Sequence, residues 1–129
     1  MDSLEYTRST ARPQSEVVAA INEAAVARGF RVLHTHQVHE TLAEKGFDIP
    51  SYSIVEVCNA RYAHAVLGIH KPVGMFLPCR FAVYTEGDQT VVSLMRPSLI
   101  SQMMPGQDFG GIPREVEDIL VAVVDDVTT

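Results

Sequence analysis

Apolar positions along the chain follow two spacings, one typical of strands and the other typical of helices. Residues 4–10 alternate and predict a first strand, and Pro13 suits the first position of a helix because its missing N–H is not needed there. This helix has one apolar face, made by Val17, Ile21, Ala24 and Ala25, and Gly29 ends it. Residues 30–37 have a period of two and predict a second strand, whose one face carries Phe30, Val32, His34 and His36.

The same two spacings continue to the end of the chain. We expect a short helix at 38–45 that buries Val38 and Leu42, a strand at 52–57, and a helix at 59–69 with Ala63, Val66 and Leu67 facing inward. Strands at 75–85 and 90–95 are joined by a tight hairpin, and Pro78 interrupts the first of them. After a loop at 96–112, Pro113 opens a last helix that buries Val116, Ile119, Leu120 and Val123.

This order of strands and helices predicts an α+β fold. Because it contains a hairpin and helices that can all pack on one face, it favours two layers, with a mainly antiparallel sheet under helices on that face. The 129 residues are 47% hydrophobic, which is enough for one core. No repeat or linker divides them, so we interpret residues 1–129 as a single domain.

Charge and composition exclude several classes of partner. The net charge is −6 and the ten Lys and Arg residues are scattered, whereas nucleic-acid binding requires clustered basic side chains. No apolar run approaches the roughly 18 to 20 residues that a membrane span requires. The first residues lack the basic and apolar regions of a secretion signal, so we expect a cytoplasmic protein whose two cysteines are free thiols.

The two cysteines are the first candidate site. Cys58 ends a predicted strand and precedes a helix, where the helix dipole and free N–H groups are expected to lower the pKa of its thiol. Cys79 follows Pro78, at a point where an interrupted strand can expose backbone groups to a ligand. The alternative for both residues is a packing role, since cysteine is among the most buried residue types.

Two segments around these cysteines resemble a known family. CNARYAHAVL at 58–67 and MFLPCRFAVY at 75–84 are similar to the family called domain of unknown function three-hundred-and-two, and the resemblance extends over 29–96. The family pattern is matched by Cys58, Asn59, Leu77, Pro78 and Cys79, whereas Ala60 and Arg80 stand where the pattern usually has Pro and Asn. The resemblance implies a TATA-binding-protein-like α+β fold and a homodimer, and it implies no biochemical role.

Histidines form the second candidate site. His34 and His36 lie two apart on one strand and so share a face, His39 follows, and His64 could supply a further ligand from a helix. The sequence contains neither Cys-x-x-Cys nor His-Glu-x-x-His, and paired histidines on a strand are also common on half-buried polar faces. We therefore expect no specific metal site.

The remaining charged and glycine-rich motifs are interpreted as structural. Glu115, Glu117 and Asp118 fall in the first turn of the last helix, where the dipole favours negative charge. Residues 109–113 contain two glycines but no lysine, so they are not a phosphate loop. We expect them to form a flexible connection that covers a neighbouring groove.

Three functions remain open. The first is a homodimeric small-ligand-binding module whose pocket lies near Cys58 and Cys79 and is lined by Asn59, Pro78 and His64. The second is a thiol-based redox protein that uses both cysteines. The third is a metal or haem site that involves His34, His36 or His64. Whether the protein is an enzyme, and which cofactor it uses, stays open, and its expected partners are a second copy of the chain and a small molecule.

Overall fold

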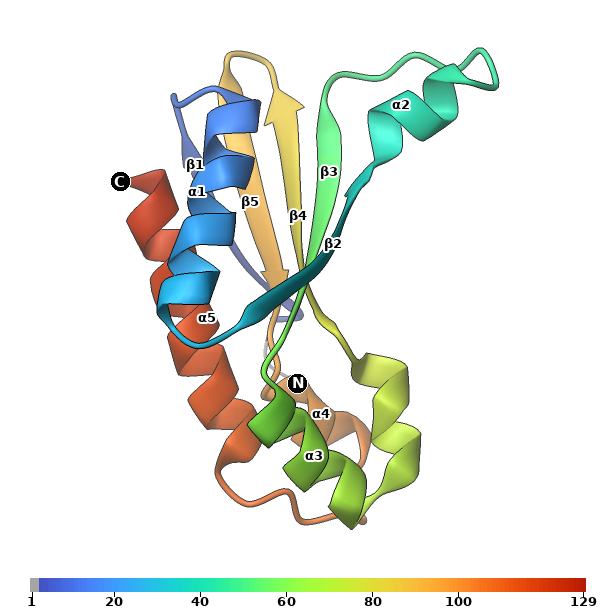
Figure 1. Ribbon diagram of the computed structural model, residues 1–129, viewed down its shortest axis with the longest axis vertical. Helices are drawn as coiled ribbons and strands as arrows, with labels where there is room; N and C mark the ends of the chain where they lie inside the picture. Colours follow the sequence, from blue (N-terminus) through green and yellow to red (C-terminus); the bar gives the residue numbers. More distant parts are fainter. Residues whose placement is uncertain (1–2) are drawn as a thin grey trace.

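A five-stranded antiparallel sheet forms the centre of the protein in a computed structural model, which describes residues 3–129 (Figure 1). The strand order is β1-β5-β4-β3-β2, and every neighbouring pair is antiparallel. The strands are β1 (Glu5–Thr10), β2 (Arg31–Gln37), β3 (Tyr52–Cys58), β4 (Cys79–Glu86) and β5 (Gln89–Met95). The predicted α+β fold with an antiparallel sheet is confirmed.

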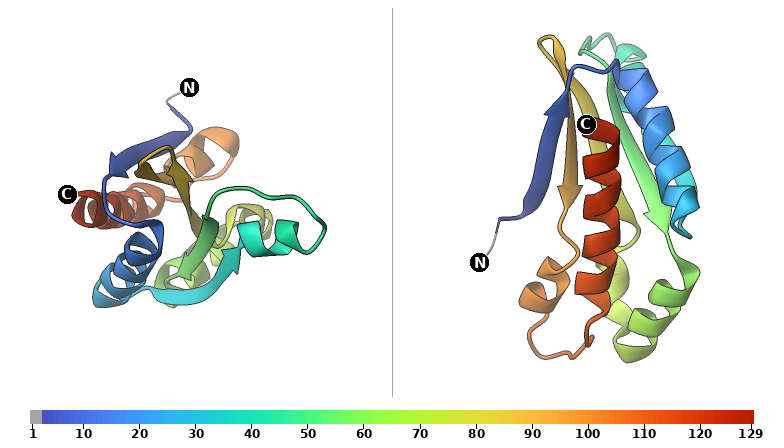
Figure 2. Two further views of the ribbon diagram at one scale, coloured as in Figure 1. Left: turned by 90° about the horizontal axis from the view of Figure 1, so that it is seen from above. Right: turned by 90° about the vertical axis from the view of Figure 1, so that its left-hand side faces the viewer.

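Two long helices cover one face of this sheet. Helices α1 (Gln14–Ala27) and α5 (Ile112–Thr128) lie side by side over the strands (Figure 2, right). Between the layers lies the main core, which contains Val17, Ile21, Val55, Val57, Phe81, Val83, Val92, Leu94, Leu120 and Val123, all fully buried. Burying one such side chain stabilises the fold by about 1.5–3 kcal/mol, so the alternating strand pattern selects this face.

A second, smaller core lies beyond one end of the strands. It is built from α3 (Ala60–Ile69), the 3₁₀ helix η1 (Lys71–Phe76), α4 (Leu99–Met103) and the loop that precedes α5, which pack together at the lower end of Figure 1. Val66, Val73, Ile100 and Phe109 are its buried residues. Ile112, at the start of α5, packs against both cores and joins them.

The predicted fourth strand begins later than expected. Residues 71–76 form η1 instead, and β4 starts only at Cys79, after a cis Leu77–Pro78 peptide bond. Pro78 therefore precedes the strand and does not interrupt it, which agrees with the lack of an N–H for the ladder.

Two predicted helices bury less than expected. Helix α2 (Val38–Ala43) projects from the upper end of β2 in Figure 1, and it leaves Val38 and Leu42 only half-buried. In α3 the side chain of Leu67 is exposed, because this helix contacts the second core along a narrow stripe that contains Val66. Val38, Leu42 and Leu67 all lie outside the main core, so the apolar spacing overstates their burial.

A bulge in β2 changes the predicted faces of that strand. The pairing with β3 shifts between Val32 and His34, so Val32 pairs with Val57 on the helix-covered face while His34 pairs with Glu56 on the opposite face. His34 and His36 do share a face, as predicted, but Val32 does not share it. An extra residue in one strand reverses every later side chain, and the period of two does not reveal it.

Glu117 is the buried charge that attaches the loop after β5 to α5. Its carboxylate accepts hydrogen bonds from Ser98 N (3.0 Å), Ser98 Oγ (2.6 Å) and Arg96 Nη2 (3.2 Å). Burial alone would raise the pKa of Glu117, but these bonds outweigh it and hold the pKa below its ordinary value. The structural interpretation of Glu117 did not anticipate its burial, and Glu117 lies beyond the first turn of α5, whose first-turn acidic residue is Glu115.

We expect Glu117→Gln to lower the free energy of unfolding by about 3 kcal/mol at pH 7, because it leaves Arg96 without its buried partner. A carboxyl group whose pKa is lower in the folded than in the unfolded protein stabilises the fold at pH values above its unfolded pKa. This stabilisation is lost as the pH falls through the folded pKa. The difference from wild type should therefore shrink at pH 3 in urea unfolding. Asp118→Asn, an exposed change in the same helical turn, is the control, and an equal loss in both variants would contradict the assignment.

Candidate functional site

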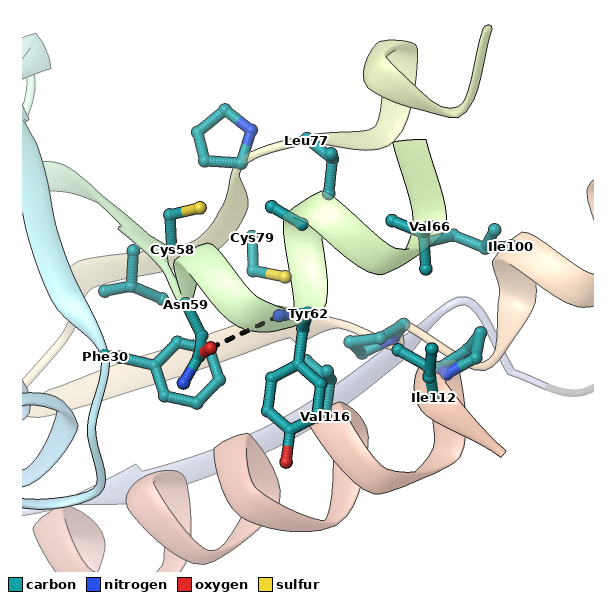
Figure 3. Close-up of a pocket in the computed structure, with 15 residues that line it drawn as sticks. Phe30, Cys58, Asn59, Tyr62, Val66, Leu77, Cys79, Ile100, Ile112 and Val116 are labelled. Carbon is teal, nitrogen blue, oxygen red and sulfur yellow. Dashed lines mark hydrogen bonds between the residues drawn. The ribbon is translucent and has the colours of Figure 1, made fainter. Parts of the chain in front are cut away.

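A narrow apolar pocket lies where the two cores meet. Four of the five residues predicted to bind a ligand line it, Cys58, Asn59, Pro78 and Cys79 (Figure 3). The other lining side chains are Phe30, Val57, Tyr62, Ala63, Val66, Leu77, Pro97, Ile100, Ile112, Pro113 and Val116. Its volume is about 40 Å³, and a second cavity of about 60 Å³ lies on the other side of Pro78 and Cys79. Such spaces hold only a few heavy atoms.

Asn59 forms part of the pocket wall, and its side-chain amide is hydrogen-bonded to backbone groups of the protein. Its Oδ1 caps α3 by accepting from Arg61 N (3.0 Å) and from Tyr62 N (3.3 Å), the second of which is the dashed line in Figure 3. Its Nδ2 donates to the carbonyl of Gly29 (3.1 Å), whose φ of +85° ends α1. Asn59 thus attaches α3 to the α1–β2 turn.

Cys58 precedes this cap and gains nothing from the helix terminus. The N–H groups that were expected to stabilise its thiolate bind the Asn59 side chain instead. Burial raises the pKa of the Cys58 thiol above its ordinary value. The prediction of an acidic Cys58 was therefore wrong.

Cys79 lies deeper and is even less acidic. Burial is the main cause that raises the pKa of its thiol to about 11, the nearby Cys58 adds to the shift, and Arg80 opposes it. At neutral pH both cysteines carry S–H groups, which pack as small, polarisable apolar groups.

The two thiols reach the pocket from opposite sides of the sheet. Cys79 pairs with Val57, whose side chain is buried under the helices, whereas Cys58 is the next residue of β3 and so points to the other face. In Figure 3 their side chains leave the backbone in opposite directions. Both cysteines are free.

The histidines lie away from this pocket. His64 is exposed on α3 and does not line the cavity. His34 and His36 are edge to face with ring centroids 4.3 Å apart, and His36 Nε2 is 2.9 Å from Glu56 Oε1. Within residues 3–129 no group of three or more His, Cys, Asp or Glu side chains is arranged to hold a metal ion.

Part of the pocket wall comes from residues 96–112, which were predicted to form a loop, and from Pro113. Pro97, just before α4, and Ile100, within α4, line one part of the pocket. Ile112 and Val116 of α5 line another. The composition of 96–112 indicated a loop throughout, but residues 99–103 form the short helix α4. Only tertiary packing brings these residues to the cysteines.

The fold and the pocket define a small α+β protein with a thiol-bearing apolar pocket beneath one antiparallel sheet. The chain belongs to the family "Domain of unknown function DUF302", whose model matches residues 6–127. The crystal structure of an uncharacterized conserved DUF302 protein from Bacillus stearothermophilus is similar, with a TM-score of 0.89, 32% identity, and coverage of 99% of this chain and 100% of that chain. No curated protein matches the chain. Among the described residues, no helix is both long and apolar enough to cross a membrane.

Iodoacetamide alkylation tests the state of the thiols. In Cys79→Ser, the Cys58 rate should rise with pH around a midpoint above the ordinary thiol value of 9.0, because burial disfavours the thiolate. In Cys58→Ser, Cys79 should react more slowly still, with a midpoint that stays above the ordinary value because burial is the main cause, but lies below about 11 because the contribution of Cys58 is removed. Both variants in urea serve as controls, and a folded-state midpoint of Cys58 below that of the unfolded chain would refute this assignment.

Proposed function

We propose that this protein is a small-ligand-binding module whose pocket beside Cys58 and Cys79 receives the apolar part of a small molecule. The observation that carries the proposal is the convergence of apolar residues from β3, α3, α4 and α5 on one gap between the two cores. Both thiols are neutral, the Asn59 amide is hydrogen-bonded within the protein, and no charged side chain lines this gap. It therefore suits an aliphatic or aromatic group.

The pocket must widen to accept such a group. Its present volume of about 40 Å³ is far below the roughly 300 Å³ at which small-molecule sites begin. The elements beneath it are short, since α4 has five residues and η1 has six, and only four buried residues form the second core. Short elements with few buried contacts open at low cost, so the ligand would enter by separating the two cores.

The rival functions have less support. A thiol-based redox protein needs an accessible thiolate, whereas the pKa of each cysteine is raised and the two side chains point to opposite faces of β3 and β4. A metal or haem site would have to draw on His64, but His64 is exposed on α3 and does not line the pocket that contains both cysteines. The free thiols fit a reducing compartment, which supports our proposal of a cytoplasmic protein.

Hexanol titration followed by amide NMR tests the pocket. We expect saturable shifts at residues 58–66 and 77–79, together with slower alkylation of Cys58. Ala63→Met should abolish them, because the longer side chain fills the cavity that Ala63 lines. Ala60→Met, an exposed change on the same helix, should leave binding intact. Absent shifts in the wild type, or equal binding by Ala63→Met, would refute the proposal.

We also propose that the protein acts as a homodimer. Beyond α2 the chain projects from the sheet in Figure 1, and there Phe47 is 64% exposed and Ile49 is 39% exposed. Apolar side chains on a projecting segment are typical of a surface that a partner covers. A second copy of the chain is the partner that the family resemblance implies.

Light scattering during size-exclusion chromatography should give twice the chain mass of 14.2 kDa at micromolar concentration. Phe47→Ser should shift the protein toward the monomer, because it removes an apolar contact from the projecting segment. Met75→Ser, an exposed apolar position (74%) in η1, far along the chain from α2, is the control. A wild-type mass near 14.2 kDa would contradict the dimer.

A further inference from the structure

A second concave site lies on the face of the sheet that α1 and α5 leave uncovered. It is a groove of about 380 Å³ between α2 and the strands β3 and β4, lined by His36, Val38, Thr41, Leu42, Ile54, Glu56 and Arg80. Unlike the pocket beside the cysteines, it is already within the size range of small-molecule sites. Its floor contains a cluster of charged side chains.

Glu56 is the centre of this cluster and its charge is compensated. Its Oε1 lies 2.9 Å from His36 Nε2, and its Oε2 accepts from Arg80 Nε at 3.2 Å. The hydrogen bond from His36 is the main cause that lowers the pKa of Glu56, burial opposes it, and Arg80 adds to the lowering. Glu56 is therefore ionised at neutral pH, and each of its oxygens has a donor.

Arg80 retains free donors after this pairing. Its Nε is used by Glu56, but within residues 3–129 no group pairs with the terminal Nη1 and Nη2 atoms, and the side chain is 48% exposed. These two nitrogens form a planar fork of parallel N–H bonds, the geometry that binds both oxygens of a carboxylate. Because Glu56 holds the Nε side, the fork has a defined orientation.

The walls of the groove are apolar. Val38 and Leu42 of α2 face Ile54 of β3 across it, and all three side chains are only half-buried. A ligand that covers this apolar surface gains about 25 cal/mol of binding free energy for each Å² removed from water. The groove thus combines one anion-binding fork with a surface for an apolar body.

We propose that this groove binds a small organic carboxylate that carries an apolar body. The carboxylate pairs with Nη1 and Nη2 of Arg80, and the apolar body contacts Val38, Leu42 and Ile54. Since the groove shares no lining residue with the cysteine pocket, this inference does not rest on the function proposed above.

Benzoate is a suitable probe, with benzamide as its neutral match. On titration into the full-length protein we expect saturable amide NMR shifts at residues 36–42, 54–56 and 80, and at least tenfold weaker binding of benzamide. Phenyl phosphate distinguishes the head group, and tighter binding of it than of benzoate would overturn the carboxylate assignment. Benzamide binding equal to that of benzoate would overturn the role of the charge.

Variants locate the site. Arg80→Gln should weaken benzoate at least tenfold, Arg80→Lys should weaken it severalfold because a point charge cannot form the fork, and Leu42→Ser should weaken it by removing apolar contact. Arg61→Gln, an exposed arginine on α3, is the matched control. Each variant is first checked for a native amide NMR spectrum and for its melting temperature. Unchanged benzoate affinity in Arg80→Lys and Leu42→Ser would overturn the proposal even if Arg80→Gln failed to fold.

Discussion

The antiparallel pairing of β3 with β4 decides where the chemically active residues of this protein point. Val57 lies opposite Cys79, and Glu56 lies opposite Arg80. Successive residues of a strand face opposite sides, so one pair enters the helix-covered face beside the cysteine pocket and the next enters the uncovered face beneath α2. A slip of β4 by a single residue could place Arg80 opposite Val57, on the helix-covered face, and would separate Arg80 from Glu56.

Because both long helices cover the same face, the sheet serves two different environments. The covered face ends below in the gap between two cores, where the lining is apolar and the thiols are neutral. On the other face the short helix α2 stands over a groove whose charges are paired except for the Arg80 fork. The first site has to open to accept a ligand, whereas the second is already open.

Local pattern was sufficient for the elements that pack on the main core and insufficient elsewhere. The core faces of α1 and α5 were predicted because burial repeats with the helical period, and the stop at Gly29 was predicted because glycine readily adopts the positive φ that ends a helix. The bulge in β2, the helix η1 and the buried charge of Glu117 depend on partners distant in sequence, which no local spacing reveals. Cys58 was found because it stands where a predicted strand meets a helix, and Cys79 because it follows Pro78 in a predicted strand. Asn59 and Pro78 joined them because they match the family pattern. The groove escaped prediction because Glu56, Arg80 and His36 are single residues that only the strand register brings together.

The register of β3 and β4 is therefore the feature to measure first. A nuclear Overhauser spectrum of the isotope-labelled protein reports which backbone protons of the two strands lie opposite each other. The structure predicts that the strongest contacts join Val57 with Cys79 and Glu56 with Arg80. Strongest contacts that join Val57 with Arg80, or Glu56 with Cys79, would mean a one-residue slip, and they would contradict the placement of both sites.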